Sequence, residues 1–326
     1  MSRTWSVFVL LLIGLALVDA PDVLAQQRRE FVGHLGPVLD VQFSPDQKFV
    51  ISGAIDATVR FWSIDGKLLE TFKHKGPARA VAISPDGKLF ISGADDRTAR
   101  LAAGKKEIGV AMFEGGGSAV AFSPDGTRVA VGSAVRTPDK VGAAIIKIFD
   151  TATMKEEQEL KGGINSVIAL TYSPDGARLA AGTRKGELHL WDVVAGKQLA
   201  EIPGHHAEIN ALRFSPDGKQ LAAMFVDKFL LVKVYDGETG KELAALPTLA
   251  KWCHSLTFAP DGKRLVGTLP ERLVVWDTAT FKETASVPLK SPRAAAFTAR
   301  GDLLVITGGS ASENHKLALQ TVPLKK

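Results

Sequence analysis

Apolar and polar residues alternate along short stretches of this chain, and the same four-residue turn interrupts the alternation at regular intervals. Ser44-Pro45-Asp46-Gln47 returns as Ser-Pro-Asp-Gly at Ser84, Ser123, Ser173 and Ser215, as Ala-Pro-Asp-Gly at Ala259, and as Thr-Ala-Arg-Gly at Thr298. Successive copies lie 40, 39, 50, 42, 44 and 39 residues apart. Seven copies at this spacing indicate a repeat protein, in which each period is one supersecondary unit.

The four residues before each turn predict a strand. The residue directly before the turn is large and apolar in every copy, and the residue two positions earlier is Val, Leu or Ala. Apolar residues with a period of two are typical of strands. One position further out the residue is small in six copies, as expected where strands converge on a crowded axis, and Asp40 is the exception.

Three more strands follow in each unit. In the first unit they cover residues 48–52, a stretch that ends at Phe61-Trp62, and residues 68–72. The Ser-Pro-Asp-Gly sequence favours a type I turn, with Gly ready for a left-handed exit. Four short strands per unit and seven units predict an all-β fold, a closed ring of four-stranded antiparallel blades.

The first unit resembles the WD40 repeat. It has Gly33-His34 ahead of the first strand, Ser52-Gly53 at the end of the second, Asp56 in the next turn and Trp62 at the end of the third. The resemblance implies a seven-bladed β-propeller in which His34, Ser52, Asp56 and Trp62 form a hydrogen-bonded structural tetrad. The second unit keeps His74 and Asp96 but has no terminal Trp, so we expect the complete tetrad only in the first blade.

The resemblance also predicts how the ring closes. The family unit starts with the outer strand of the preceding blade, and residues 29–32 precede the first Gly-His. The chain ends soon after the third strand of the seventh unit, residues 317–322. We therefore expect the N-terminal strand to complete the last blade, which leaves no unmatched inner edge.

Residues 4–18 form an uncharged apolar run between Arg3 and Asp19. The run is short for a membrane-spanning helix and fits a signal peptide cut after Ala25. This divides the chain into a leader, residues 1–25, and a propeller, residues 26–326, with 43 residues for each of seven units. We expect a bacterial-type protein exported to the periplasm or outside the cell; an uncleaved membrane anchor and a buried N-terminal helix are alternatives.

The composition adds exclusions. With 45% apolar and 23% charged residues the chain is neither disordered nor fibrous. Its single cysteine, Cys253, excludes an intrachain disulfide and a Cys-rich zinc site. A net charge of +5 allows an acidic partner, but the basic residues are scattered without interleaved aromatic residues, so no nucleic-acid site is predicted.

Candidate chemical motifs are weak. His205-His206 and Cys253-His254 are sequence neighbours, whose side chains point to opposite faces of a strand. The Gly-rich stretch 115–117 precedes a strand rather than a helix, and the turn Asp residues lie one per blade, too far apart to share calcium. We predict no catalytic residue, metal or cofactor.

The loops ahead of the first strand and between the second and third strands share one end of the ring, which we call the rim. In the family, partners usually dock there. Two of these loops stand out. Residues 134–143 lengthen the third unit to 50 residues, and residues 309–315 form a polar stretch in the seventh unit. Each loop is either a tolerated insertion or a binding site. The positions expected on the rim near the axis are Arg79, Asn165, Asn210, His254 and Arg293.

The resemblance implies a non-catalytic, monomeric platform for a protein or peptide partner. One alternative is a propeller enzyme, hydrolase- or lactonase-like, with its site in the central channel. Such a site needs several carboxylates or histidines around the axis, where Asp40 is the only acidic residue expected. A chiefly structural envelope protein is a third possibility.

Overall fold

The computed structural model describes residues 29–112, 115–134, 145–161, 166–204, 207–226, 230–248, 254–298, 301–309 and 314–324. The predicted leader, Asn165, the His205-His206 pair, Cys253 and most of the 134–143 loop lie outside the described residues. Every regular element in the described ranges is a β-strand, and none of these ranges contains a helix that could span a membrane.

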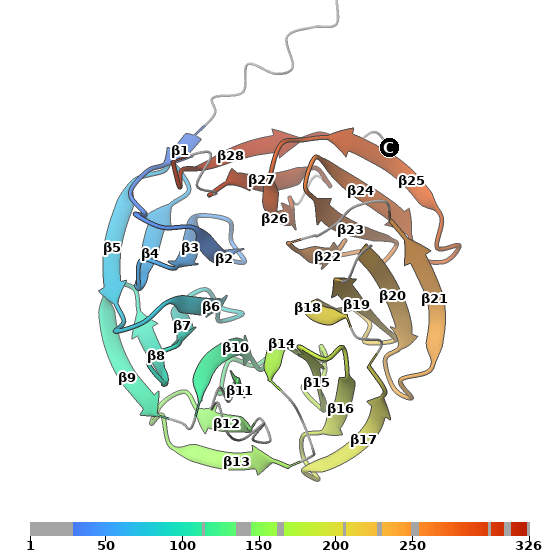
Figure 1. Ribbon diagram of the computed structural model, residues 1–326, viewed down its shortest axis with the longest axis horizontal. Coiled ribbons are helices and arrows are strands. Elements are labelled where there is room, and N and C mark those ends of the chain that lie inside the picture. Colours follow the sequence, from blue (N-terminus) through green and yellow to red (C-terminus); the bar gives the residue numbers. More distant parts are fainter. Residues whose placement is uncertain are drawn as a thin grey trace, which may run out of the picture.

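The described strands form seven antiparallel sheets of four strands each, arranged around a central axis (Figure 1), so the predicted seven-bladed β-propeller is confirmed. Blade 1 consists of β2 (Val38–Phe43), β3 (Phe49–Ala54), β4 (Thr58–Ser63) and β5 (Leu68–Lys73). Blade 2 consists of β6 (Ala78–Ile83), β7 (Leu89–Ala94), β8 (Thr98–Ala103) and β9 (Lys106–Met112). Blade 3 consists of β10 (Gly116–Phe122), β11 (Arg128–Ala134), β12 (Ile146–Asp150) and β13 (Glu156–Leu160). Blade 4 consists of β14 (Val167–Tyr172), β15 (Arg178–Thr183), β16 (Leu188–Asp192) and β17 (Lys197–Ile202). Blade 5 consists of β18 (Glu208–Phe214), β19 (Gln220–Val226), β20 (Leu230–Asp236) and β21 (Glu242–Pro247). Blade 6 consists of β22 (Leu256–Phe258), β23 (Arg264–Leu269), β24 (Arg272–Asp277) and β25 (Glu283–Pro288). Blade 7 consists of β26 (Pro292–Phe297), β27 (Leu303–Gly308), β28 (Leu317–Val322) and β1 (Arg29–Phe31).

The repeated turn joins the inner strand of each blade to the second strand. In the second copy Gly87 donates its backbone N–H to the Ser84 carbonyl oxygen at 2.9 Å and has φ of 72°. The first copy places Gln47 in the same left-handed region, with φ of 58°, where a side chain is unfavourable. The Gln47 side chain donates to the Phe297 carbonyl oxygen of blade 7 at 2.5 Å, so this exception links the first blade to the last.

The ring closes through the N-terminal strand, as predicted. β1 pairs with β28 in antiparallel register, with Arg29 opposite Leu319 and Phe31 opposite Leu317. The two ends of the described chain therefore share blade 7, at the top of Figure 1. Phe31 is 1% exposed and contacts Trp62 edge-on, with ring centroids 5.7 Å apart.

The core lies between blades rather than within one of them. Each blade packs both faces against its neighbours, so the second strands are buried along nearly their whole length. At the junction of blades 7 and 1, the buried cluster joins Phe31, Val38, Trp62, Ile306 and Leu317. Strands buried on both faces need near-continuous apolar sequence, which Phe49–Ala54 and its equivalents provide.

Candidate functional site

Each inner strand bends just before it reaches the channel. In six blades the pairing of the inner strand with the second strand skips one residue, which is a β-bulge. A bulge redirects one side chain, and bulges concentrate near functional sites. The skipped residue lies five positions before the repeated turn; with the residue at the same offset in blade 6, the set is Leu39, Arg79, Ser118, Ile168, Asn210, His254 and Arg293.

These seven side chains, which we call the bulge ring, line one cavity of about 250 Å³ at the rim end of the channel. At the next position along the inner strand the lining residue is small in most blades, with Ala80, Ala119, Ala169 and Ala211 in equivalent places. Two charged residues break this pattern of small side chains, Asp40 from blade 1 and Arg213 from blade 5. The inner strands β2 and β18 that carry them lie on different sides of the channel (Figure 1).

Asp40 is the only acidic residue in this cavity among those that the structure describes, as the sequence predicts. Its Oδ1 accepts the Val41 N–H at 2.8 Å, and its Oδ2 accepts the Val81 N–H of blade 2 at 2.9 Å. Burial raises the pKa of Asp40, while these two N–H groups and Arg213 act in the opposite direction. The carboxylate therefore faces the channel wall and ties blade 1 to blade 2.

Arg213 is the second charged group at depth. Its guanidinium donates to the Leu212 carbonyl oxygen at 2.8 Å, and no carboxylate in the described part of the chain lies within 4.0 Å of it. Burial lowers the pKa of Arg213, and the charge of Asp40 raises it. Arg213 is partly buried, and partial burial of a cation without a close counter-ion favours an anionic neighbour.

Arg293 and His254 stand side by side in the bulge ring. The Arg293 guanidinium donates to the Gly308 carbonyl oxygen at 2.8 Å and to the Val38 carbonyl oxygen of blade 1 at 3.3 Å. It also approaches His254 Nδ1 at 3.5 Å. Burial, together with the Arg293 charge, lowers the pKa of His254 to about 4, so His254 is neutral at pH 7.

Arg79 lies at the exposed edge of the bulge ring. It forms two hydrogen bonds with the Asp95 carboxylate, 2.9 Å from Nε to Oδ1 and 2.7 Å between the other pair of atoms. Asp95 follows the second strand of the same blade. This two-point pair fixes the guanidinium at the mouth of the cavity and raises its pKa.

Of the five rim residues expected from the sequence, Arg79, Asn210, His254 and Arg293 line this one cavity. Asn165 lies outside the described residues, and Ile168 occupies the equivalent place in blade 4. Among the other lining residues, sequence reasoning did not single out Leu39, Ser118 or Arg213. A constant offset of five residues from the turn identifies every member of the bulge ring, and strand alternation places Arg213 on the channel face.

The predicted tetrad residues of blade 1 are hydrogen-bonded to one another. His34 Nε2 lies 2.8 Å from Ser52 Oγ, and His34 Nδ1 lies 3.0 Å from Asp56 Oδ2. Trp62 Nε1–H donates to Ser52 Oγ at 2.9 Å. Ser52 is completely buried, so the network braces the blade from within.

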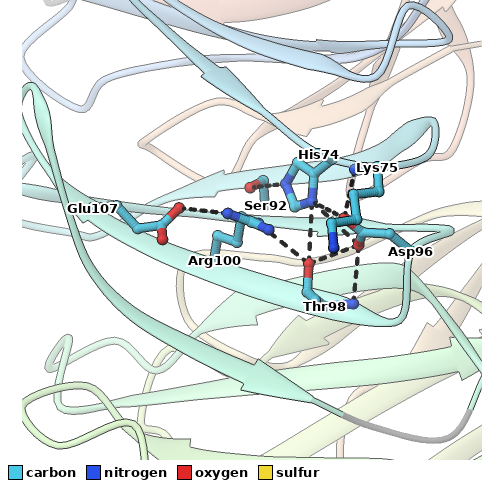
Figure 2. Close-up of polar contacts among 7 residues, drawn as sticks. All are labelled: His74, Lys75, Ser92, Asp96, Thr98, Arg100 and Glu107. Carbon is cyan, nitrogen blue, oxygen red and sulfur yellow. Dashed lines mark hydrogen bonds and ion pairs between the residues drawn. The ribbon is translucent and has the colours of Figure 1, made fainter.

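Blade 2 has a similar network that lacks the Trp (Figure 2). His74 Nε2 lies 2.9 Å from Ser92 Oγ, and His74 Nδ1 lies 3.2 Å from both Asp96 Oδ2 and Thr98 Oγ1. Ala102 stands where blade 1 has its Trp. Loss of the indole therefore leaves the other three members of the network in place.

Both networks connect Ser, His and Asp in the order found in hydrolase triads. The hydroxyl groups, however, are inside the blades: Ser52 is 0% and Ser92 2% exposed. Neither serine lines the channel cavity. A nucleophile must reach its substrate, so these two networks are structural. In the described ranges there is also no cluster of three or more His, Cys, Asp or Glu that could hold a metal ion.

Blade 4 shows what happens when the tetrad serine is missing. Ala181 occupies the place of Ser52, and the buried Trp191 Nε1–H has no hydrogen-bond partner among the described residues. His189 stacks on this indole with ring centroids 5.5 Å apart. Packing alone therefore holds Trp191, without the polar link present in blade 1.

Two exposed apolar side chains lie on the rim loops of blade 1. Leu35 is 84% and Ile55 47% exposed, although both side chains are large and apolar. Their loops are tied together, because the Leu35 N–H donates to Asp56 Oδ2 at 2.8 Å and the Ile55 N–H donates to the Pro37 carbonyl oxygen at 3.0 Å. We call Leu35 and Ile55 the apolar rim pair.

Comparisons with known proteins agree with this architecture. Residues 25–63 match the family model described as WD domain, G-beta repeat, and residues 79–272 match the one described as Nucleolar protein 10-like, N-terminal domain. Transcription initiation factor TFIID subunit 5 of Caenorhabditis elegans is 54% identical over 35 residues, 11% of this chain and 5% of that protein. WD repeat-containing protein 36 of Homo sapiens is 40% identical over 67 residues, 19% of this chain and 8% of that protein. The matched region is thus less than a tenth of either relative.

Proposed function

We propose that this chain is a non-catalytic scaffold. It belongs to the β-propeller family described as nucleolar protein 10-like, N-terminal domain, and it has a WD repeat in its first blade. It binds a protein or peptide partner at the rim, over the mouth of the channel. A propeller fold alone hosts many functions, so the proposal rests on the site.

The bulge ring carries the proposal. The same backbone feature places one side chain per blade around a single cavity, while the layer beneath is nearly uniform in Ala. The bulge positions differ from blade to blade and include two guanidinium groups, an imidazole, an amide, a hydroxyl and two aliphatic side chains. A ring that only had to close would not need this variety, whereas a surface that recognises one partner in one orientation does.

The apolar rim pair supports a macromolecular partner. Large apolar side chains next to polar groups are typical of the centres of protein interfaces. Leu35 is 84% exposed, so most of its surface contacts water rather than other apolar side chains. A partner that covers Leu35 and Ile55 removes this area from water and gains hydrophobic free energy.

A matched pair of substitutions tests the platform. Leu35 and Val194 are both 84% exposed, but Leu35 lies on the rim and Val194 lies in the turn between β16 and β17, at the other end of the ring. We expect Leu35→Asp to reduce the protein recovered with the tagged chain from its own cells, and Val194→Asp to leave it unchanged. Equal recovery with both variants would contradict the rim as the binding surface.

Export is the second part of the proposal, and it rests on the uncharged run of residues 4–18. We expect cell fractionation to place the protein outside the cytosol and N-terminal sequencing of the mature protein to begin at Gln26. A full-length protein in the cytosol would contradict export and leave the binding proposal intact, because the rim does not depend on the leader.

A further inference from the structure

Hydrogen-bond donors outnumber acceptors among the polar side chains of the channel cavity. Arg213, Arg293 and Asn210 bring guanidinium and amide N–H groups to its lining. The neutral His254 adds one ring N–H donor, and its Nδ1 lies 3.5 Å from the Arg293 guanidinium. A cavity with this inventory is complementary to a ligand that accepts hydrogen bonds and carries negative charge.

Arg213 is the strongest reason to expect an anion. A guanidinium has five N–H donors, and the described residues provide it with the Leu212 carbonyl oxygen as its hydrogen-bond acceptor. Burial disfavours its charged form, which a carboxylate in the cavity would stabilise. The equivalent position is Gln, Ala or Thr in the other six blades. Arg213 is the one cation at this position, and the described part of the ring supplies no carboxylate within 4.0 Å of it.

Asp40 does not remove this preference. Both of its carboxylate oxygens already accept backbone N–H groups, from Val41 and Val81, and it lies more than 4.0 Å from Arg213. Arg293 adds a second positive charge at the mouth. The charges that line the cavity therefore sum to a positive value even when Asp40 is ionised.

We propose, on the basis of the rim function proposed above, that the partner inserts an acidic side chain into the channel cavity, where Arg213 and Arg293 bind its carboxylate. The partner segment is an extended peptide rather than a free small anion, because the apolar rim pair lies at the same end of the ring and would contact apolar residues that flank the acid. A small anion would leave Leu35 exposed.

The probe is a display library of random twelve-residue peptides, selected on the full chain. Recovered peptides are synthesised in two forms, with Glu or Asp and with the corresponding Gln or Asn, and their dissociation constants are measured by calorimetry. We expect Glu or Asp to be enriched at one position, and the amide form to bind about ten- to a hundredfold more weakly, as is typical for loss of a charge-assisted hydrogen bond.

The variants are Arg213→Gln, Arg213→Lys and the control Arg128→Gln. Arg128 is paired with Glu157 beside the repeated turn, at the end of the ring away from the rim. We expect Arg213→Gln to weaken the acidic peptide about tenfold or more and to leave the amide peptide unchanged. Arg213→Lys keeps the charge and should lose less, whereas Arg128→Gln should bind like the unaltered chain.

Two failures have different meanings. Peptides that bind at the rim, are weakened by Leu35→Asp, and show neither acidic enrichment nor sensitivity to Arg213→Gln would overturn the acidic insertion while leaving the platform in place. Recovery of no peptide, or only of peptides insensitive to Leu35→Asp, would contradict both proposals. Melting curves of each variant separate loss of binding from loss of the fold.

Discussion

The N-terminal strand closes the ring, and Phe31 is the residue that anchors it. Phe31 is 1% exposed and packs in a cluster with Trp62, Val38 and Leu317, which belong to blades 1 and 7. Phe31→Ala removes most of this buried ring and leaves a cavity that the stiff, two-sided packing cannot fill. The substitution therefore tests closure without deleting any backbone.

The expected loss follows from the environment. Truncation of a fully buried Phe costs about 3–5 kcal/mol, and the edge-on contact with Trp62, at 5.7 Å between centroids, favours the upper half of this range. An unfolding entropy of about 2.1 cal/mol/K per residue gives about 0.6 kcal/mol/K for a ring of about 300 residues. The melting temperature should therefore fall by about 6–8 °C.

Scanning calorimetry of the two variants Phe31→Ala and Glu30→Ala measures this loss. Glu30 lies on the same strand but is exposed, so its substitution should change the free energy of unfolding by no more than about 0.5 kcal/mol. If Phe31→Ala melts within 2 °C of Glu30→Ala, about the shift for 1 kcal/mol, then β1 does not hold the ring closed.

Three further predictions concern single side chains. Ser52→Ala should lower the free energy of unfolding in urea by about 1–3 kcal/mol, and more than Ser92→Ala, because only Ser52 also accepts an indole N–H; equal losses would contradict the tetrad. Ala181→Ser should raise the free energy of unfolding by about 0.5–1.5 kcal/mol, because the new hydroxyl gives the Trp191 Nε1–H a hydrogen-bond acceptor. An unchanged unfolding midpoint in urea would show that this hydrogen bond does not form. The pKa of His254 is about 4 in the folded protein, below the ordinary value of 6.5 in the unfolded chain, so the stability that neutral His254 contributes is complete above pH 6.5 and is lost as the pH falls toward 4. His254→Gln should therefore flatten the decline of the melting temperature between pH 6.5 and pH 4. Parallel melting profiles of the variant and the unaltered chain would refute this.

The architecture could be predicted from the sequence because one signal repeats seven times. Each turn has its own physical cause, and a single worn copy, such as the one at Thr298, does not disturb the period. Closure could be predicted for the same reason, since residues 29–32 precede the first complete unit and the last unit lacks its fourth strand. Pairing of β1 with β28 confirms that part.

The site was less accessible to sequence reasoning, for a geometric reason. A bulge changes the side-chain alternation by one residue, so a strand pattern without it cannot say which residue of the inner strand turns into the channel. Choosing positions at or ahead of each strand found Asn210 and Arg293 but selected Asn165 instead of Ile168 in blade 4. Arg213 could not be singled out in the same way, because a polar residue on an inner strand shows its role only when the inner strands of the other blades form the cavity around it.

The networks show a similar limit. His74 and Asp96 were visible in the sequence, but the missing Trp in blade 2 argued against a tetrad there. The structure keeps the Ser-His-Asp part because His74 contacts Ser92 and Asp96 directly and needs no indole to do so. A motif can therefore lose one member and keep its local hydrogen bonds when the remaining members contact each other.

Binding of a partner over the rim is the central proposal for this protein. A photoreactive amino acid placed at position 35, in intact cells, tests this directly against the same substitution at position 194, since Leu35 and Val194 are equally exposed at opposite ends of the ring. We expect a discrete crosslinked protein from position 35 and none from position 194. Crosslinks from position 194 alone, or the same products from both, would contradict it.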